Sequence, residues 1–372
     1  MAKRPLVNDA YLSLQPYVPG KPVAETEREL GIRGVVKLAS NENPLGPSAK
    51  AVEAIQKGLS GLHDYPDGSA FYLKRRLAEH LGWGPEHLIV GNGTNELIEM
   101  LIRTCMRPGE NMLYVPGTFV IYKLCAQAAG VPVKETPLRN MHYDLDAVAD
   151  LADAQTKLVF IANPNNPTGT YVGASALQRF VDALDDDVLV VIDEAYREYV
   201  RAPDYPNGLD FLRQRERCLL MRTFSKCYGL AGARVGYAVG HPELIDYLNR
   251  GRQPFNVNNV GQWAASAALD DTEHLEASVA LNHAQMDLLV PALRERGLGV
   301  TDSQANFVLV DFYRDATAVF EALLRQGVIV RPMGGYGFPT AARVTVGTEA
   351  QNAKLLSALD AVLPRIEPAA AG

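Results

Sequence analysis

The sequence predicts an α/β protein with a large, mostly parallel central sheet that is covered by helices, and a smaller α/β domain beside it. Short runs rich in Val, Ile and Leu alternate with segments of helical periodicity along the chain. Glycine, proline and asparagine follow several of these runs, as expected where strands end in loops. With 372 residues, 47% hydrophobic and 21% charged, the chain is long enough for one large domain and a smaller one.

Apolar runs in the first two thirds of the chain predict the strands of the large sheet. In such folds, ligands bind beyond the carboxyl ends of the strands, so the loops after these runs are the first place to look for a site. The predicted strands are Leu88–Val90, Asn111–Val115, Leu158–Ile161, Val188–Ile192, Cys218–Thr223 and Arg234–Val239.

The last third of the chain predicts the smaller domain. A long helix is expected over Glu273–Arg296, followed by strands over Ala305–Asp311, Gly327–Arg331 and Ala342–Val346. We expect residues 46–265 to form the large domain and residues 266–372 the small one. Residues 1–45 are expected to pack with the small domain and with a partner subunit.

Charge and composition exclude several classes of protein. The 36 basic and 43 acidic residues give a net charge of −7, which offers nucleic acid no obvious basic surface. No apolar run approaches the ~18 residues of a membrane span, and the N-terminus lacks the apolar stretch of a secretory signal. The four cysteines form no CxxC pair and no metal-ligand spacing, so we expect a reduced, cytoplasmic protein without a metal.

The segment GNGTNELIEMLIR predicts a turn from strand to helix that is able to hold a phosphate. Gly93, Thr94 and Asn95 open the helix, where free N–H groups and the helix dipole favour an anion. A plain capped turn explains the same residues and is the commoner case for such a segment taken alone. Glu96 occupies the position of the third glycine of a dinucleotide fingerprint, which argues against a nicotinamide cofactor.

Polar residues also follow three later strands. Asp193 ends the run VLVVID and is followed by Tyr196; an acid there is a cap, a metal ligand or the partner of a protonated ring nitrogen. Asn166 in NPNNPTG is able to donate its amide to a ring oxygen, although a turn alone accounts for that loop.

The segment RTFSKCYGLAGARVGY contains a candidate nucleophile. Lys226, if its amine is neutral, is able to form a Schiff base with a carbonyl, although a solvated surface lysine is the commoner outcome. Ser225 and Arg234 supply a hydroxyl and a fixed cation, which together suit a phosphate dianion.

Taken in order, NPNNPTG, DEAY, SK and the arginine eight positions after the lysine resemble the fold-type I, pyridoxal-phosphate (PLP) dependent aminotransferases of the class II family. The segments QPYVPGKP, LASNENPLGPS, YPDG, GVIVRP and RVTVGT are similar to histidinol-phosphate aminotransferases in particular. The resemblance implies transamination of L-histidinol phosphate with 2-oxoglutarate, giving imidazole acetol phosphate and L-glutamate. It implies ping-pong kinetics and a place in histidine biosynthesis.

The same resemblance implies roles for the cofactor-binding residues. Lys226 would bind PLP covalently, Asp193 would hold the ring nitrogen, and Tyr196 and Asn166 would bond the 3-oxygen. Lys226, Asp193 and Tyr196 are the implied catalytic residues. The phosphate would lie among Gly93, Thr94, Asn95, Ser225 and Arg234, while Phe119 would stack on the ring where the family commonly has tyrosine. Tyr65 would reach the site of the partner subunit, which requires a homodimer.

The substrate-binding residues implied by the resemblance are Arg343, Arg331, Tyr17 and Asn43. Two arginines suit a phosphate because each guanidinium makes a bidentate contact. An aminotransferase for aromatic or other amino acids and a PLP-dependent threonine-phosphate decarboxylase remain alternatives. A PLP-binding regulator is disfavoured, because the ~45 residues before the fold are too few for a DNA-binding helix-turn-helix module and its linker.

Overall fold

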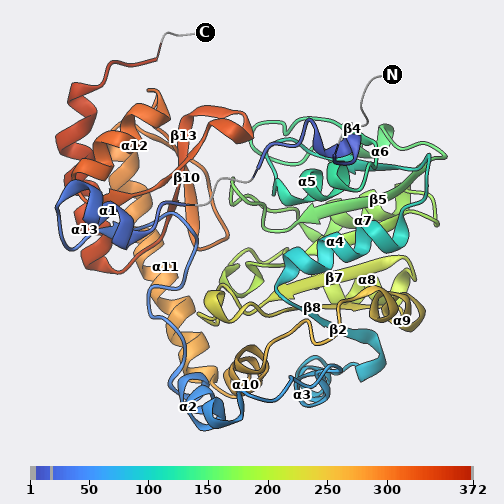
Figure 1. The fold of residues 1–372 in the computed structure, drawn as a ribbon. Helices are drawn as coiled ribbons and strands as arrows, with labels where there is room; N and C mark the ends of the chain where they lie inside the picture. Colours follow the sequence, from blue (N-terminus) through green and yellow to red (C-terminus); the bar gives the residue numbers. More distant parts are fainter. Residues whose placement is uncertain (1–5, 17–19, 370–372) are drawn as a thin grey trace.

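A computed structural model describes residues 6–16 and 20–369 of the chain (Figure 1). Its central feature is a seven-stranded sheet with the order β2-β8-β7-β6-β5-β3-β4, in which only β8 runs against its neighbours. The mostly parallel sheet predicted from the apolar runs is therefore confirmed. The strands are β2 (Leu88–Gly91), β3 (Asn111–Tyr114), β4 (Val133–Glu135), β5 (Thr156–Ala162), β6 (Leu189–Asp193), β7 (Cys218–Thr223) and β8 (Gly236–Gly240).

Helices cover both faces of this sheet because its central strands are apolar on both sides. Along β6, Leu189 and Val191 face one hydrophobic cluster while Val190 and Ile192 face the other. The first face is covered by α4 (Thr94–Cys105), α5 (Ile121–Ala128) and α9 (Pro242–Gly251). The second is covered by α3 (Phe71–Leu81), α6 (Leu145–Asp150), α7 (Ala174–Ala183), α8 (Gly208–Gln214) and α10 (Asn259–Ala268).

The C-terminal part of the chain builds a second sheet with its own core. Its order is β12-β13-β10-β9, from β9 (Gly299–Val300), β10 (Phe307–Asp311), β12 (Arg331–Met333) and β13 (Phe338–Thr345). The helices α11 (Thr272–Glu295), α12 (Ala316–Arg325) and α13 (Glu349–Val362) pack against it. Figure 1 shows α11 running from this domain toward α2 (Ala49–Gly58) and α10 at the far end of the large sheet.

The N-terminal segment joins the small domain through backbone pairing. After α1 (Val23–Leu30), the short strand β1 (Val36–Lys37) pairs in parallel with β11 (Val328–Ile329). Short 3-10 helices lie at Asp9–Tyr11, Leu59–Gly61, Pro85–His87, Arg197–Tyr199, Ala231–Ala233, Gly334–Tyr336 and Leu363–Arg365. We keep 1–45, 46–265 and 266–372 as the proposed division of the chain.

Two predicted strands differ from the structure. The strand expected from Arg234 begins at Gly236, because Arg234 has a left-handed backbone (φ 59°) that no strand accepts. The single strand expected over Gly327–Arg331 is divided at Val330, so that β11 pairs with β1 and β12 pairs with β13.

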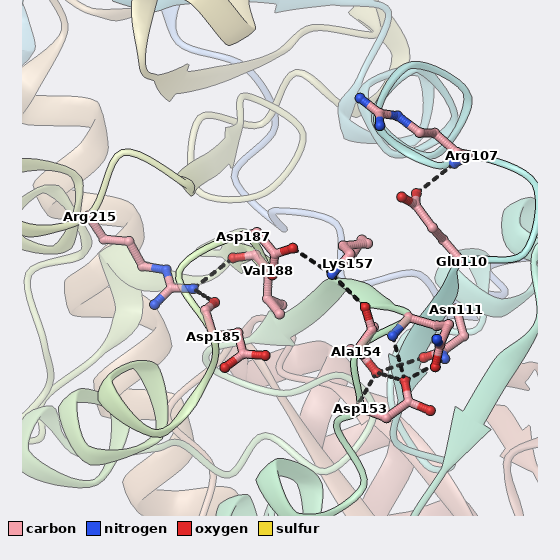
Figure 2. A network of polar contacts seen from close by, with 12 residues as sticks. Arg107, Glu110, Asn111, Asp153, Ala154, Lys157, Asp185, Asp187, Val188 and Arg215 are labelled. Atoms are coloured by element: carbon pink, nitrogen blue, oxygen red, sulfur yellow. Dashed lines mark hydrogen bonds and ion pairs between the residues drawn. The ribbon is translucent and has the colours of Figure 1, made fainter.

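The amino ends of β3, β5 and β6 are joined by polar contacts (Figure 2). Thr156 donates to Asn111 (2.8 Å), and Lys157 forms an ion pair with Asp187 (2.6 Å). Arg215 donates to the carbonyl of Val188 (2.9 Å). These side chains hold the amino ends of the strands together. The predicted site residues lie at the carboxyl ends of the same sheet.

Within the described ranges, no helix combines the length and the apolar character needed to cross a bilayer.

Candidate active site

A cavity of about 270 Å³ lies where the carboxyl ends of β5, β6 and β7 meet the small domain. Residues from both sheets and from the N-terminal segment line it. Most of the predicted site residues, although far apart in the sequence, are brought together here: Thr94, Asn95, Phe119, Asn166, Asp193, Tyr196, Ser225, Lys226, Arg234, Arg331 and Arg343.

Strand order explains this convergence. Asp193 is the last residue of β6 and pairs with Ala162 of β5 on one side and Met221 of β7 on the other. The loop with Asn166 follows β5, and Lys226 follows β7. Because parallel strands end at one edge, all three polar side chains face the same cavity.

Asp193 is a buried carboxylate (5% exposed) held by two neutral donors. The hydroxyl of Tyr122 donates to its Oδ2 (2.7 Å), and the backbone N–H of Ala195 donates to its Oδ1 (3.2 Å). Burial raises the pKa of Asp193 to about 6, against the opposing effects of these hydrogen bonds and of Lys226. An acid in this setting is stabilised by a cation that enters the cavity, such as a protonated ring nitrogen.

Lys226 lies on the same cavity wall as Tyr196. Its Nζ is 5.5 Å from the centre of the Tyr196 ring, and it donates to the carbonyl of Ser40 (3.3 Å). The buried ring of Tyr196 therefore forms part of its surroundings, and Phe307 packs edge-on against that ring at 5.1 Å.

The start of α4 forms a cradle for an anion. Gly93 has φ +75°, and a Cβ at this position would lie 2.4 Å from Nη2 of Arg234. The guanidinium of Arg234 therefore occupies the space that any larger residue would fill. Thr94, Asn95 and Ser225 complete a set of backbone, hydroxyl and guanidinium donors. This set fits a phosphate group.

Arg343 is a buried cation (7% exposed) on β13. It donates from Nη1 to Oδ1 of Asn166 (2.5 Å) and from Nη2 to the carbonyl of Ala39 (2.7 Å). Because the Asn166 oxygen is engaged in this bond, Nδ2 is its remaining polar atom, and it is a donor. Arg331 pairs with Arg343 across β12 and β13, and both arginines line the cavity.

A buried ion pair lies behind the site. Glu194, adjacent to Asp193 but fully buried, accepts from Nε of Arg222 (2.9 Å) and from the backbone N–H of Gly208 (3.1 Å). It does not line the cavity. Arg222 is on β7 and Glu194 follows Asp193 at the end of β6. This pair therefore holds the carboxyl ends of β6 and β7 together next to Asp193.

The structure does not place Tyr65 or Asn43 in the cavity lining. Tyr65 is 81% exposed and stacks on Phe255 (4.7 Å between ring centres). Tyr17 lies outside the described residues. Asn43 does not line the cavity. Its amide nitrogen donates to the carbonyl of Cys227 (2.8 Å) and to Ser278 (2.8 Å), and the predicted substrate contact at Asn43 stays a prediction.

Sequence reasoning missed two residues that touch the predicted ones. Tyr122 bonds Asp193, and Asn41 donates from Nδ2 to the Tyr196 oxygen (2.9 Å). Both lie next to residues or segments used in the prediction. Tyr122 is three residues after Phe119, and Asn41 is at the start of NENP within LASNENPLGPS. Their partners are 71 and 155 residues away, so no local pattern identified the contacts.

The fold and this cavity define an enzyme of the fold-type I transferase class. The chain belongs to the aminotransferase class I and II family, which matches residues 33–359. The family predicted from the motifs is therefore confirmed.

Relatives of the chain carry more specific names. It is 50% identical over 361 residues to a histidinol-phosphate aminotransferase of Anaeromyxobacter sp., covering 96% of this chain and 99% of the relative. It is 48% identical over 364 residues to one of Moorella thermoacetica, covering 98% and 94% of the two chains. A crystal structure of a histidinol-phosphate aminotransferase from Sinorhizobium meliloti in complex with pyridoxal-5'-phosphate superposes with a TM-score of 0.90 at 27% identity, covering 98% of this chain and 99% of that one.

Proposed function

We propose that this protein is a PLP-dependent aminotransferase that transfers the amino group of L-histidinol phosphate to 2-oxoglutarate, giving imidazole acetol phosphate and L-glutamate, in histidine biosynthesis. One observation carries the proposal. A single cavity is lined by Lys226, by the buried carboxylate of Asp193, by an anion cradle at α4 and by two arginines. The names of the near full-length relatives support the choice of substrate.

Different residues around the cavity would bind different groups of the cofactor. Asp193 would accept a hydrogen bond from the protonated ring nitrogen, and Phe119 would pack on the ring. Thr94, Asn95, Ser225 and Arg234 hold the phosphate, with Gly93 leaving room for Arg234. Tyr196 and Asn166 would donate to the 3-oxygen. When bound, PLP supplies the electron sink for the pair released from the substrate Cα–H bond.

Lys226 moves the proton. Its Nζ would hold the cofactor covalently, and once freed by the substrate its neutral amine would take the proton from the substrate Cα as general base. The Lys226 ammonium formed in this way would give the proton back, as general acid, to complete the half-reaction. Because the two half-reactions use one site in turn, we expect ping-pong kinetics.

The two arginines bind the anionic end of the substrate. Arg343 is fixed by Asn166 and by the Ala39 carbonyl, so its guanidinium has a defined direction. Arg331, on the adjacent strand, adds a second positive charge that suits the dianionic phosphate of histidinol phosphate. The contact of Tyr17 with the same phosphate stays a prediction.

The proposal includes a cytoplasmic homodimer in which Tyr65 completes the partner's phosphate site. Support comes from four exposed aromatic residues around this position, Tyr65, Phe71, Tyr72 and Phe255, with Tyr65 stacked on Phe255 and Phe71 packed edge-on against Tyr72. Apolar surface of this kind is typical of an interface. The four cysteines are free, in keeping with a reducing compartment.

A substrate comparison tests the proposed reaction. Purified enzyme with PLP is assayed with 2-oxoglutarate and with histidinol phosphate, phenylalanine or threonine phosphate in turn. We expect kcat/KM to be highest for histidinol phosphate. A preference for phenylalanine would identify an aromatic aminotransferase instead, and release of carbon dioxide from threonine phosphate would identify a decarboxylase.

A further inference from the structure

Asn41 connects the small domain to Tyr196. Its side chain is buried (1% exposed) and its backbone is left-handed, with φ +55°. The backbone N–H donates to Oγ1 of Thr345 on β13 (2.9 Å), and the carbonyl accepts from Nδ2 of Asn306 (3.1 Å). Asn41 is therefore fixed to the same strand that carries Arg343.

The orientation of the Asn41 amide follows from its neighbours. The Thr345 hydroxyl accepts from the Asn41 N–H, so its single proton is available for Oδ1 of Asn41, 3.2 Å away. With the amide oxygen placed toward Thr345, Nδ2 is the atom that faces Tyr196 and donates to its phenol oxygen (2.9 Å).

This hydrogen bond sets the direction of the Tyr196 phenol. A phenol oxygen that accepts from an amide N–H keeps its own proton for another partner. Tyr196 is buried (4% exposed), lines the cavity and packs against Phe307, which leaves the cavity as the direction for that proton. The charged groups that act on this phenol are Lys226, Arg343 and Asp193.

We propose that Asn41 is a positioning residue that makes Tyr196 a hydrogen-bond donor to the 3-oxygen of the cofactor. The inference rests on the proposed function, because it assigns a direction to a contact with PLP. The segment Ala39–Asn41 also accepts the bond from Arg343, so the substrate-binding arginine and the Tyr196 donor are held by the same stretch of chain.

A double-mutant cycle on the loaded enzyme tests the inference. Asn41→Gly removes the amide and keeps the positive φ without strain, and Tyr196→Phe removes the phenol. The measurement is the pH midpoint at which the visible absorbance of the lysine-bound cofactor changes. A donor at the 3-oxygen stabilises its anionic form and so favours loss of the nearby proton. We expect each single change to raise the midpoint by roughly half to one pH unit.

The double variant decides between a positioning role and an independent one. If Asn41 acts through Tyr196, the double variant has the midpoint of Tyr196→Phe alone. An unchanged midpoint in Asn41→Gly, or a shift that adds in full to that of Tyr196→Phe, would overturn the inference. A purely structural role would lower the melting temperature of the cofactor-free protein and leave the midpoint unmoved.

A second variant keeps the test valid if Asn41→Gly does not fold. Asn41→Asp tolerates the left-handed backbone and keeps an oxygen for Thr345, but it offers Tyr196 an acceptor. The phenol proton then turns away from the cofactor. The midpoint is expected to rise more in the presence of Tyr196 than in the Tyr196→Phe background. Equal shifts in the two backgrounds would mean that the added charge acts alone, which contradicts the inference.

The unmodified protein separates this inference from the proposed function. Addition of PLP to it should produce the visible absorbance band of the lysine adduct. If no band forms, the proposed function fails and the inference with it. If the band forms but its midpoint is insensitive to Asn41, only the inference fails.

Discussion

The phenol of Tyr122 donates a 2.7 Å hydrogen bond to Oδ2 of Asp193, and both buried residues line the cavity. The ring of Tyr122 is held by stacking on Phe160 (4.6 Å between centres) and by an edge-on contact with Phe119 (5.5 Å). A neutral donor placed in this way stabilises the carboxylate without neutralising it. The negative charge of Asp193 therefore remains available to a cation in the cavity.

Removing this donor should weaken cofactor binding. Tyr122→Phe keeps the ring packing, raises the pKa of Asp193 further and is expected to raise the Kd for PLP about tenfold, since a hydrogen bond to a charged group is worth about 1.5–3 kcal/mol. The loss of PLP affinity should be greatest at acidic pH, because the Asp193 carboxyl of the variant is protonated at a higher pH than that of the unmodified protein. Titration of cofactor-free protein with PLP over a range of pH measures both effects.

A matched control is Tyr143→Phe. The Tyr143 phenol oxygen accepts from the N–H of Ala162, the last residue of β5 (3.1 Å). Tyr143 makes no hydrogen bond with Asp193, whose donors are Tyr122 and Ala195. We expect it to cost stability without a pH-dependent loss of PLP affinity. The same pH-dependent loss in both variants would mean that Tyr122 has no special relation to Asp193.

Replacing Asp193 itself should stabilise the cofactor-free protein. Its pKa in the folded protein, about 6, exceeds the ordinary value of 3.8, so the folded state binds this proton more tightly than the unfolded state. The buried charge therefore destabilises the fold increasingly as pH rises from 3.8 through 6, by on the order of 3 kcal/mol. Asp193→Asn removes that charge and keeps an acceptor for Tyr122.

Thermal melts of cofactor-free protein across this pH range measure the effect. The melting temperature of Asp193→Asn should exceed that of the unmodified protein at neutral pH, and the difference should vanish in acid. Added PLP should raise the melting temperature of the unmodified protein far more than that of the variant. A difference that is independent of pH would show that the carboxylate charge is not the cause.

The sequence predicted the parts of the fold that depend on local pattern. Apolar runs identified β5, β6 and β7, and the polar residues after them converged because parallel strands end at one edge. The predicted start of β8 was wrong because Arg234 has a positive φ. This backbone conformation accompanies a long-range contact, in which the Arg234 guanidinium occupies the space beside Gly93. The division at Val330 arises because β11 pairs with an N-terminal strand that no local signal announces.

The site shows the same limit. Asn41 and Asn43 are identical side chains two residues apart in one motif, yet only Asn41 bonds a predicted catalytic residue. The difference is set by the left-handed backbone at Asn41 and by Thr345, which is distant in sequence. Residue type and motif placed the segment at the site, but the direction of each side chain depends on long-range contacts.

The cradle at α4 makes Gly93 sensitive to a single methyl group. Gly93→Ala places a Cβ 2.4 Å from Nη2 of Arg234, so the guanidinium must leave its position. We expect the Kd for PLP to rise at least about tenfold, through loss of a charge-assisted phosphate contact. Binding titrations and the melting temperature of the cofactor-free protein are measured together.

Gly82→Ala provides the control for backbone strain. Gly82 has φ +67°, close to that of Gly93, but a Cβ there meets nothing within 4 Å. Its substitution should cost about 1 kcal/mol of stability and leave the Kd unchanged. If both alanine variants lost PLP affinity equally, strain rather than displacement of Arg234 would be responsible.

The proposed role of Tyr65 predicts complementation between two inactive variants. Tyr65→Ala removes a side chain that is 81% exposed, so its fold should be unaffected, while Lys226→Ala removes the cofactor attachment. In a mixed dimer one site receives its lysine from one subunit and its tyrosine from the other. Random pairing should restore about a quarter of the unmodified activity, because half of the dimers each contain one complete site.

Co-expression of the two variants with different affinity tags, followed by purification through both tags, isolates the mixed dimers. Activity well above that of either parent supports a shared site. Mixed dimers that are as inactive as the parents, or a Tyr65→Ala enzyme with full activity, would show that Tyr65 does not serve the partner.

The pairing of Arg331 with Arg343 across adjacent strands distinguishes the two arginines. Like charges in directly opposed positions destabilise a sheet, and a dianion between them relieves this more than a single carboxylate does. Arg331→Ala should therefore raise the KM for histidinol phosphate about tenfold or more and that for glutamate by less than about threefold. Arg331→Lys, which keeps the charge and loses the forked geometry, should give KM values between these limits.

Arg343→Ala should impair both substrates, since Arg343 also holds Asn166. Equal losses for the two substrates in Arg331→Ala would mean that Arg331 does not select for phosphate.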